Sequence, residues 1–234
     1  AEEEGSTPLS CSTSPVRNAG LFHTPMPAKD KIQQMFDGIA PDYDRLNHLM
    51  SLGVDKTWRA RALREIVDAR RAQAILDIAC GTGDFSLAIA RRMHPDSRIT
   101  GLDLSEGMLA VMRDKVEKAG LSDRIACEQG DSEAMRWADG TFDVATIAFG
   151  IRNFAHREAA LREILRVLKP GGRFMITNES DGKNAGSLKW TKIVDGMTVY
   201  TEEQLRKLLT KAGFTEIQVD DQVNKDKICV IAIA

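Results

Sequence analysis

The sequence lacks paired or clustered cysteines. Its four cysteines, Cys11, Cys80, Cys127 and Cys229, lie far apart and form neither a CxxC pair nor a metal-ligand spacing. This spacing argues against a disulfide framework and a zinc site, and it favours a reducing, cytoplasmic compartment. We therefore expect no metal in the functional site.

Long apolar runs and an excess of basic charge are missing too. No apolar run approaches the roughly 18 residues of a membrane span, and 32 Lys and Arg against 34 Asp and Glu give a net charge of -2. Phosphate-backbone binding normally needs a basic excess, so we expect no nucleic-acid partner. The first four residues, Ala-Glu-Glu-Glu, do not resemble a secretory signal. With 43% hydrophobic and 28% charged residues, the chain has the balance of a globular domain.

The N-terminal third of the chain divides into two segments. Residues 1–27 are rich in Ser, Thr and Pro without apolar periodicity, which indicates a disordered tail or a cloning remnant. Residues 28–70 carry two helical patterns, and we expect them to form a lid over the site. The first pattern, expected to end before Pro41, consists of Ile32, Met35, Phe36 and Ile39, and the second covers about 55–69.

Residues 71–234 alternate between short apolar runs and helical patterns. Helical patterns over about 84–93, 105–119 and 156–168 separate most of the early runs, which predicts parallel strands joined by right-handed crossovers. The last two runs are only about eight residues apart, so they should form an antiparallel hairpin. The predicted fold is α/β and Rossmann-like: a mostly parallel sheet with helices on both faces and a C-terminal hairpin strand. Its seven expected strands are 74–79, 98–102, 124–128, 142–149, 173–177, 214–219 and 228–233.

A turn with two glycines, Cys80-Gly81-Thr82-Gly83, follows the first strand and leads into a helix. Glycine at such a turn lets the backbone approach a ligand closely. A dinucleotide fingerprint needs a third glycine where this chain has Ser86, and Asp84 at the helix start would repel a pyrophosphate. Asp84 suits instead a ligand that carries an ammonium and a sulfonium.

Acidic residues also follow the second and third strands. Asp103 lies about twenty residues beyond the glycines, where a carboxylate can accept both hydrogen bonds of a ribose diol. The alternative for Asp103 is a helix N-cap, but Ser105 is the better cap. Asp131, between Gly130 and Ser132, can accept a hydrogen bond from the exocyclic amine of adenine, or it is simply a turn residue.

These motifs, together with Phe142-Asp143-Val144-Ala145 and Arg166–Gly172, resemble class I S-adenosylmethionine-dependent methyltransferases. More narrowly, residues 29–172 resemble the ubiquinone/menaquinone biosynthesis C-methyltransferase family, on Met35–Asn47, Trp58-Arg59 and Ala148–Phe154. The resemblance implies S-adenosylmethionine as cofactor and S-adenosylhomocysteine as product. The residues expected to bind the cofactor are Asp77, Ala79, Gly81, Thr82, Gly83, Asp103, Leu104, Met108, Gly130, Asp131, Ser132 and Phe149.

The same resemblance places the reacting groups at Arg152, Asn153 and Tyr43, the first two at the end of the fourth strand. Arg152 would activate a water or stabilise a phenolate, and its permanent charge favours the phenolate role. Asn153 and Tyr43 would orient that network. The alternatives are a surface ion pair of Arg152 with Glu158 or Asp143, and a helix cap for Tyr43.

The expected reaction is C-methylation of a demethylmenaquinol- or ubiquinol-type ring. Methyl transfer to another small molecule, a cofactor-binding protein with little turnover and, most remotely, a nicotinamide dehydrogenase are the alternatives. A hydrophobic quinol as partner leaves a peripheral membrane contact open, and a homodimer is open as well.

After Gly172 the sequence resembles a different group of small-molecule methyltransferases. Two interpretations are open: a compact natural relative, or an engineered chimera joined near Lys169-Pro170-Gly171-Gly172, which the abrupt change favours. In either case the roof of the acceptor pocket would come from the part after Gly172, with Glu179, Trp190 and Met197 as candidates. Core packing is the alternative for Trp190.

Overall fold

The computed structural model describes residues 29–51, 63–179, 200–224 and 227–234. The predicted tail over 1–27 lies outside these residues, as do Trp190, Met197 and the side chain of Glu179. Of the second lid helix, only a helical turn over 63–66 is described.

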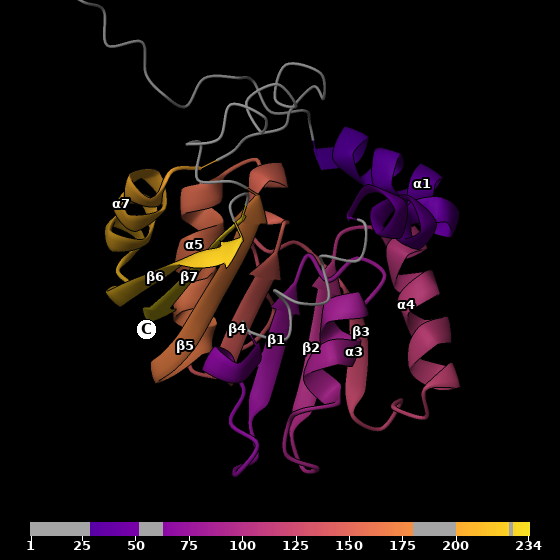
Figure 1. The fold of residues 1–234 in the computed structure, drawn as a ribbon, viewed down its shortest axis with the longest axis horizontal. Coiled ribbons are helices and arrows are strands. Elements are labelled where there is room, and N and C mark those ends of the chain that lie inside the picture. The colour runs from indigo at the N-terminus through magenta and orange to yellow at the C-terminus, as the bar shows by residue number, and fades with distance from the viewer. Residues whose placement is uncertain (1–28, 52–62, 180–199, 225–226) are drawn as a thin grey trace, which may run out of the picture.

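One seven-stranded sheet forms the centre of the protein, in the order β3-β2-β1-β4-β5-β7-β6 (Figure 1). Strands β1 to β5 run parallel, and β7 is antiparallel to both of its neighbours. The predicted sheet and its C-terminal hairpin are therefore confirmed. The strands are β1 Ala74–Ile78, β2 Arg98–Asp103, β3 Ile125–Gln129, β4 Phe142–Ala148, β5 Leu168–Glu179, β6 Thr215–Asn224 and β7 Lys227–Ile233.

Strand β7 lies inside the sheet, between β5 and β6. Its residues Ile228 and Val230 are buried on one face, while Cys229 and Ile231 are buried on the other. A strand that is apolar on both faces belongs in the interior of a sheet. The more polar β6 accordingly forms the edge.

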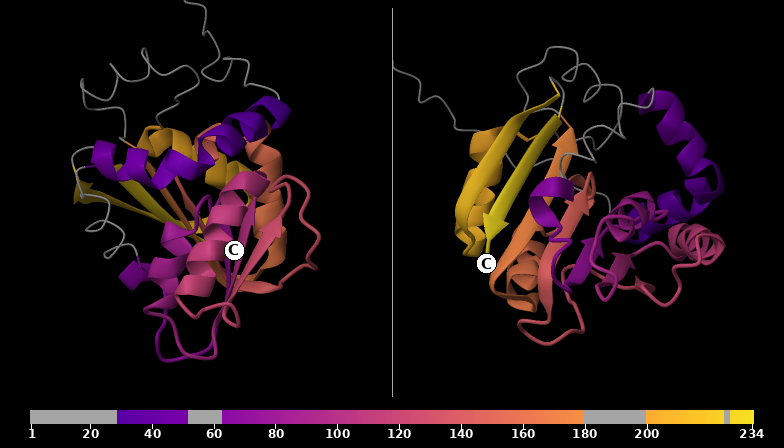
Figure 2. Two further views of the ribbon diagram at one scale, coloured as in Figure 1. Left: turned by 90° about the vertical axis from the view of Figure 1, so that its right-hand side faces the viewer. Right: turned by 60° about the horizontal axis from the view of Figure 1, so that its bottom comes forward.

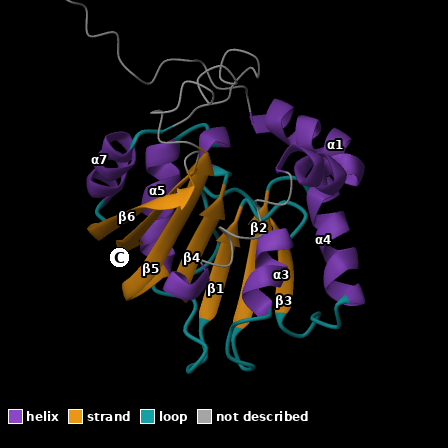
Figure 3. Cartoon of the chain, viewed as in Figure 1, coloured by secondary structure: helices purple, strands orange, loops and turns teal. Residues whose placement is uncertain are grey.

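Helices cover both faces of the sheet (Figure 3). α3 (Asp84–Ala90) and α4 (Glu106–Lys118) pack on one face, and α5 (Arg157–Val167) and α7 (Glu202–Ala212) pack on the other. The sequence analysis did not predict α7, although it carries clear end signals. Thr201 and Gln204 form a capping box at its start, and Gly213 ends it with φ 109°.

Helix α1 (Lys29–Ser51) crosses the carboxyl edge of the sheet and contains Pro41. The prediction that this helix ends before Pro41 was wrong. A proline removes one backbone hydrogen bond and bends a helix without necessarily ending it, and Figure 2 shows α1 changing direction along its length. Contacts span the bend. The rings of Phe36 and Tyr43, on either side of it, pack edge to face with their centroids 6.3 Å apart, and Ala40 is buried.

Among the described residues, no helix combines the length and the hydropathy that crossing a bilayer requires.

Candidate cofactor and acceptor site

The carboxyl ends of β1, β2, β3 and β4 open into one pocket that α1 covers. Parallel strands bring their carboxyl ends to the same sheet edge, which explains why residues from four separate turns meet there. The space they enclose is about 890 Å³, counting the part open to solvent. Of the predicted site residues, those that line it are Tyr43, Ala79, Gly81, Asp103, Leu104, Met108, Gly130, Asp131, Ser132, Phe149, Arg152 and Asn153.

The turn after β1 has a left-handed backbone. Gly81 has φ 55° and Gly83 has φ 81°, while Ala79 takes φ 52° against the usual preference of a residue with a Cβ. A Cβ on Gly83 would lie 2.5 Å from Cγ of Met112. Gly83 therefore serves the packing of the turn against α4, whereas the backbone of Gly81 faces the pocket.

Asp77 lies beneath this turn and not among the residues that line the pocket. It is 1% exposed and accepts hydrogen bonds from Ser86 Oγ at 2.5 Å and Thr146 Oγ1 at 2.8 Å. Thr82 is also buried, and its hydroxyl donates to Asp44 on α1. The structure thus places Asp77, Thr82 and Gly83 behind the pocket wall, and a direct contact with the cofactor stays a prediction for them.

Asp103 joins the ends of β1 and β2. Its carboxylate accepts hydrogen bonds from the backbone N–H of Gly81 at 2.8 Å and of Ser105 at 2.9 Å. Ser105 caps α4, as expected, by accepting from Met108 N–H. Burial raises the pKa of Asp103, although these N–H groups act in the opposite direction. The backbone N–H of Leu104 also stabilises this carboxylate, so of its roughly four acceptor positions about one remains for a diol hydroxyl.

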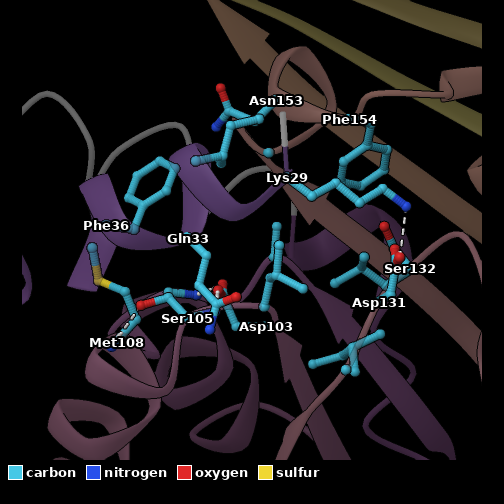
Figure 4. A pocket seen from close by; sticks show the side chains of 18 of the residues that line it. Lys29, Gln33, Phe36, Asp103, Ser105, Met108, Asp131, Ser132, Asn153 and Phe154 are labelled. Carbon is cyan, nitrogen blue, oxygen red and sulfur yellow. Dashed lines mark hydrogen bonds and ion pairs between the residues drawn. The ribbon is translucent and has the colours of Figure 1, made fainter. Parts of the chain in front are cut away.

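Asp131 meets a partner that the sequence analysis did not anticipate. Lys29 Nζ lies 2.6 Å from Oδ2 of Asp131 and 2.6 Å from Oε2 of Glu133, as Figure 4 shows for Asp131. Burial alone would raise the pKa of Glu133, but hydrogen bonds from Lys29 and His156 lower it. An adenine amine at Asp131 would therefore have to share the carboxylate with Lys29.

Arg152 and Asn153 lie beyond the end of β4, not at it. The strand ends at Ala148, the backbone reverses at Phe149 with φ 63°, and both residues belong to the 3-10 helix η1 (Ile151–Asn153). Gly150 allows this turn, because a Cβ there would lie 2.4 Å from the Cβ of Ala79. The tight contact brings Arg152 and Asn153 to the pocket.

The carboxylates considered as alternative partners of Arg152 bind other cations. Asp143 pairs with Lys169 at 2.9 Å, and Glu158 pairs with Arg162 and Lys211.

Asp84 does not line the pocket, where the sequence analysis expected it to meet a cationic ligand. Its carboxylate lies 2.6 Å from Lys115 Nζ, and Asp84 is not among the described residues that line the pocket. Because Lys115 compensates its charge, the argument that Asp84 selects a cationic ligand was wrong in its geometry.

Helix α1 contributes pocket residues that the sequence analysis missed. Lys29, Gln33 and Phe36 line the pocket, and Figure 4 shows Gln33 reaching in on the side of Asp103. Helical periodicity identified Ile32 and Phe36 as one apolar face, but it does not tell which surface that face covers.

Comparison with known proteins agrees with this geometry. The sequence model of the ubiE/COQ5 methyltransferase family matches residues 26–192. The chain belongs to the ubiE/COQ5 methyltransferase family.

Curated relatives of this family member match over part of their length. The demethylmenaquinone methyltransferase of Bacteroides fragilis is 46% identical over 147 residues, which are 63% of this chain and 59% of that protein. The ubiquinone/menaquinone biosynthesis C-methyltransferase UbiE of Geobacter sulfurreducens is 50% identical over 147 residues, which are 63% of this chain and 57% of that protein. The match thus spans less than two thirds of each relative.

Solved structures show the fold. The [4+2]-cyclase SpnF superposes with a TM-score of 0.73 at 22% identity, over 89% of this chain and 96% of that chain. A SAM-dependent methyltransferase from Aquifex aeolicus superposes with a TM-score of 0.63 at 20% identity, over 88% of this chain and 98% of that chain. The expected class I methyltransferase fold is confirmed, and the presence of a cyclase in the group shows that the fold alone does not set the reaction.

The interpretation of the chain as a chimera finds no support. The family match continues to residue 192, beyond the proposed join at Lys169–Gly172. β5 also runs through that turn, paired with β4 on one side and with β7 on the other.

Proposed function

We propose that this chain binds S-adenosylmethionine at the ends of β1 to β4 and methylates a ring carbon of a quinol such as demethylmenaquinol. The observation that carries the proposal is that Asp103, Asp131, Arg152 and Tyr43, from four separate segments, line one pocket. Family membership supports it, as do the names of the two curated relatives.

The cofactor half of the pocket fits S-adenosylmethionine. The Asp103 carboxylate lines the pocket and suits a hydroxyl of the ribose diol, and the bare backbone of Gly81 admits the ligand closely. Asp131 suits the adenine amine, and Met108 offers an apolar surface to the ring system. When bound, S-adenosylmethionine supplies a methyl group on a sulfonium, whose departure leaves a neutral thioether.

The acceptor half would stabilise a phenolate. Loss of a ring hydroxyl proton to water leaves a phenolate, and the Arg152 guanidinium stabilises it without itself acting as the base. The electron density would reach the adjacent ring carbon, which would form the new C–C bond as the donor's S–C bond breaks. That carbon would then lose its proton to water, and the ring oxygen would regain a proton to restore the aromatic hydroquinol. Asn153 and Tyr43 orient the hydroxyl, and Ile32, Phe36, Phe149 and Phe154 surround a flat apolar ring.

A methyl-transfer assay with labelled S-adenosylmethionine and reduced short-chain naphthoquinols and benzoquinols tests the proposal. Arg152→Ala should lower kcat by about 10²–10³, because it removes charge stabilisation of the reacting phenolate, while S-adenosylhomocysteine binding changes little. The matched control is Arg162→Ala, since Arg162 pairs with Glu158 on the surface of α5.

Three other results of the transfer and binding assays would change the proposal. Unchanged turnover in Arg152→Ala would remove Arg152 from the mechanism. Cofactor binding without transfer to any quinol would favour another acceptor or a binding protein, and binding of NAD in place of S-adenosylmethionine would overturn the proposal. A peripheral membrane contact, a homodimer and a cytoplasmic location stay predictions.

A further inference from the structure

Lys115 is a charged residue behind the pocket that connects α1 to the turn over residues 79–83 after β1, which we call the cofactor turn. From α4, its Nζ lies 2.7 Å from Asp44 Oδ2 on α1 and 2.6 Å from Asp84 Oδ1 at the start of α3. The Lys115 side chain is only 22% exposed. Asp44 also accepts a hydrogen bond from Thr82, which belongs to the turn itself. One ammonium therefore connects three elements.

The C-terminal half of α1 needs such a support. Pro41 has no N–H to donate to the carbonyl of Asp37, so one backbone hydrogen bond between the two halves of the helix is missing. Past this break, the side-chain contacts of Asp44 tie the helix to the rest of the protein. Tyr43, the neighbour of Asp44, lines the pocket and moves with the same turn of helix.

The charges make Lys115 more than one contact among several. Asp44 and Asp84 both lie within hydrogen-bond distance of the same Nζ, so the two carboxylates are close to each other. Without the lysine they would repel, and in a partly buried position solvent screens this repulsion only in part. Removing Lys115 should therefore push α1 away from the cofactor turn.

We infer that Lys115 is a positioning residue that holds α1 closed over the cofactor turn and thereby places Tyr43 in the pocket. The inference rests on the proposed function only in that the pocket binds S-adenosylmethionine. It assigns a role to an ion pair that lies outside the pocket lining and touches no reacting atom.

The test compares Lys115→Met with the wild-type chain by hydrogen exchange of residues 40–51 and by calorimetric titration with S-adenosylhomocysteine. We expect faster exchange in this part of α1. A lid that is closed only a tenth of the time weakens the apparent affinity about tenfold, because affinity scales with the binding-competent fraction. Lys118→Met is the matched control, since Lys118 follows one turn later on α4 and, among the residues that the structure describes, pairs with Asp114 of the same helix.

Two further variants separate the charge effect from a loss of folding. Lys115→Arg keeps the charge and should retain most of the protection of α1. Combining Lys115→Met with Asp44→Asn and Asp84→Asn removes the repulsion, while the new amide at position 44 keeps an oxygen for Thr82. This triple variant should exchange more slowly than Lys115→Met alone.

The inference is overturned if Lys115→Met exchanges and binds like the wild-type chain, or if the triple variant exchanges as fast as Lys115→Met. A wild-type chain that does not bind S-adenosylhomocysteine would contradict the proposed function instead. The exchange comparison in the ligand-free protein would still decide the role of Lys115.

Discussion

Two aspartates near the carboxyl ends of neighbouring strands, Asp77 and Asp103, have different roles. Asp77 points into the protein, where the hydroxyls of Ser86 and Thr146 satisfy it. Asp103 lines the pocket, and its carboxylate accepts hydrogen bonds from the backbone N–H groups of Gly81 and Ser105. The first carboxylate holds the strand and α3 together, and the second is placed to receive a ligand.

The ionisation of Asp103 should make cofactor binding pH-dependent. A ribose diol needs the ionised carboxylate as acceptor, and burial raises the pKa of Asp103. Affinity for S-adenosylhomocysteine should therefore fall as the pH decreases, starting above the ordinary aspartate pKa of about 3.9. Calorimetric titrations over a pH series measure this effect.

Asp103→Asn should bind weakly across that pH series, without this dependence. The control is Asp96→Asn, whose side chain is 79% exposed, and its pH profile should match that of the wild-type chain. An affinity that stays constant down to the ordinary aspartate pKa would contradict the assignment.

At the scale of elements, α1 is held to the domain at three points along its length. Lys29 binds the turn after β3, Asp44 binds the cofactor turn and α4, and Asp37 accepts hydrogen bonds from Ser105 Oγ at 2.5 Å and Gly107 N at 2.9 Å. Asp37 thus places a carboxylate at the N-terminus of α4, in addition to Glu106 in the first turn of that helix. The helix dipole favours negative charge at this end.

Gly107→Ala should loosen this docking. A Cβ at position 107 would lie 3.0 Å from the backbone Cα of Asp37, so α1 has to move away from α4. Overpacking of this kind costs about 1 kcal/mol or more, so exchange in α1 should become about fivefold faster. Hydrogen exchange measures the change.

Gly38→Ala is the control for that experiment. A Cβ at position 38 meets nothing within 4 Å, and alanine favours a helix, so protection of α1 should stay or increase. Equal exchange in both variants would show that the contact between Gly107 and Asp37 does not hold the lid.

At the scale of the whole molecule, β5 joins the two parts of the sheet. Its face toward α5 and α7 carries Phe174, which is fully buried and stacks on Phe214 with ring centroids 5.1 Å apart. Residues from β1, β4, β5, α5, α7 and β7 belong to this one core cluster. The core is therefore continuous across the turn near Gly172.

Phe174→Ala should lower the free energy of unfolding by about 3–5 kcal/mol, the usual cost of removing a buried aromatic ring. Urea unfolding followed by circular dichroism and by tryptophan fluorescence should show one shared transition, because the sheet unfolds as a unit. Phe174→Leu is the milder control. Two separate transitions would indicate that the parts before and after Gly172 are independent.

The local sequence pattern was sufficient to predict most of the sheet and part of the pocket lining. Apolar runs placed all seven strands, and the polar residues that follow those runs identified Asp103, Asp131 and the region of Arg152. It was also sufficient for Ser105 as a helix cap. These features depend on residues that are close in the sequence, so the rules for apolar periodicity and helix capping can predict them.

Docking between distant segments decided the rest. Lys29 and Asp131 are 102 residues apart, and Lys115 and Asp44 are 71 apart, so no local pattern links them. The continuation of α1 past Pro41 and the pairing of Asp84 with Lys115 depend on the same contacts. The sequence by itself thus determined the sheet and the acidic strand ends. Only the tertiary structure decided which charges compensate one another and where α1 docks, because partners are chosen by proximity in the folded chain.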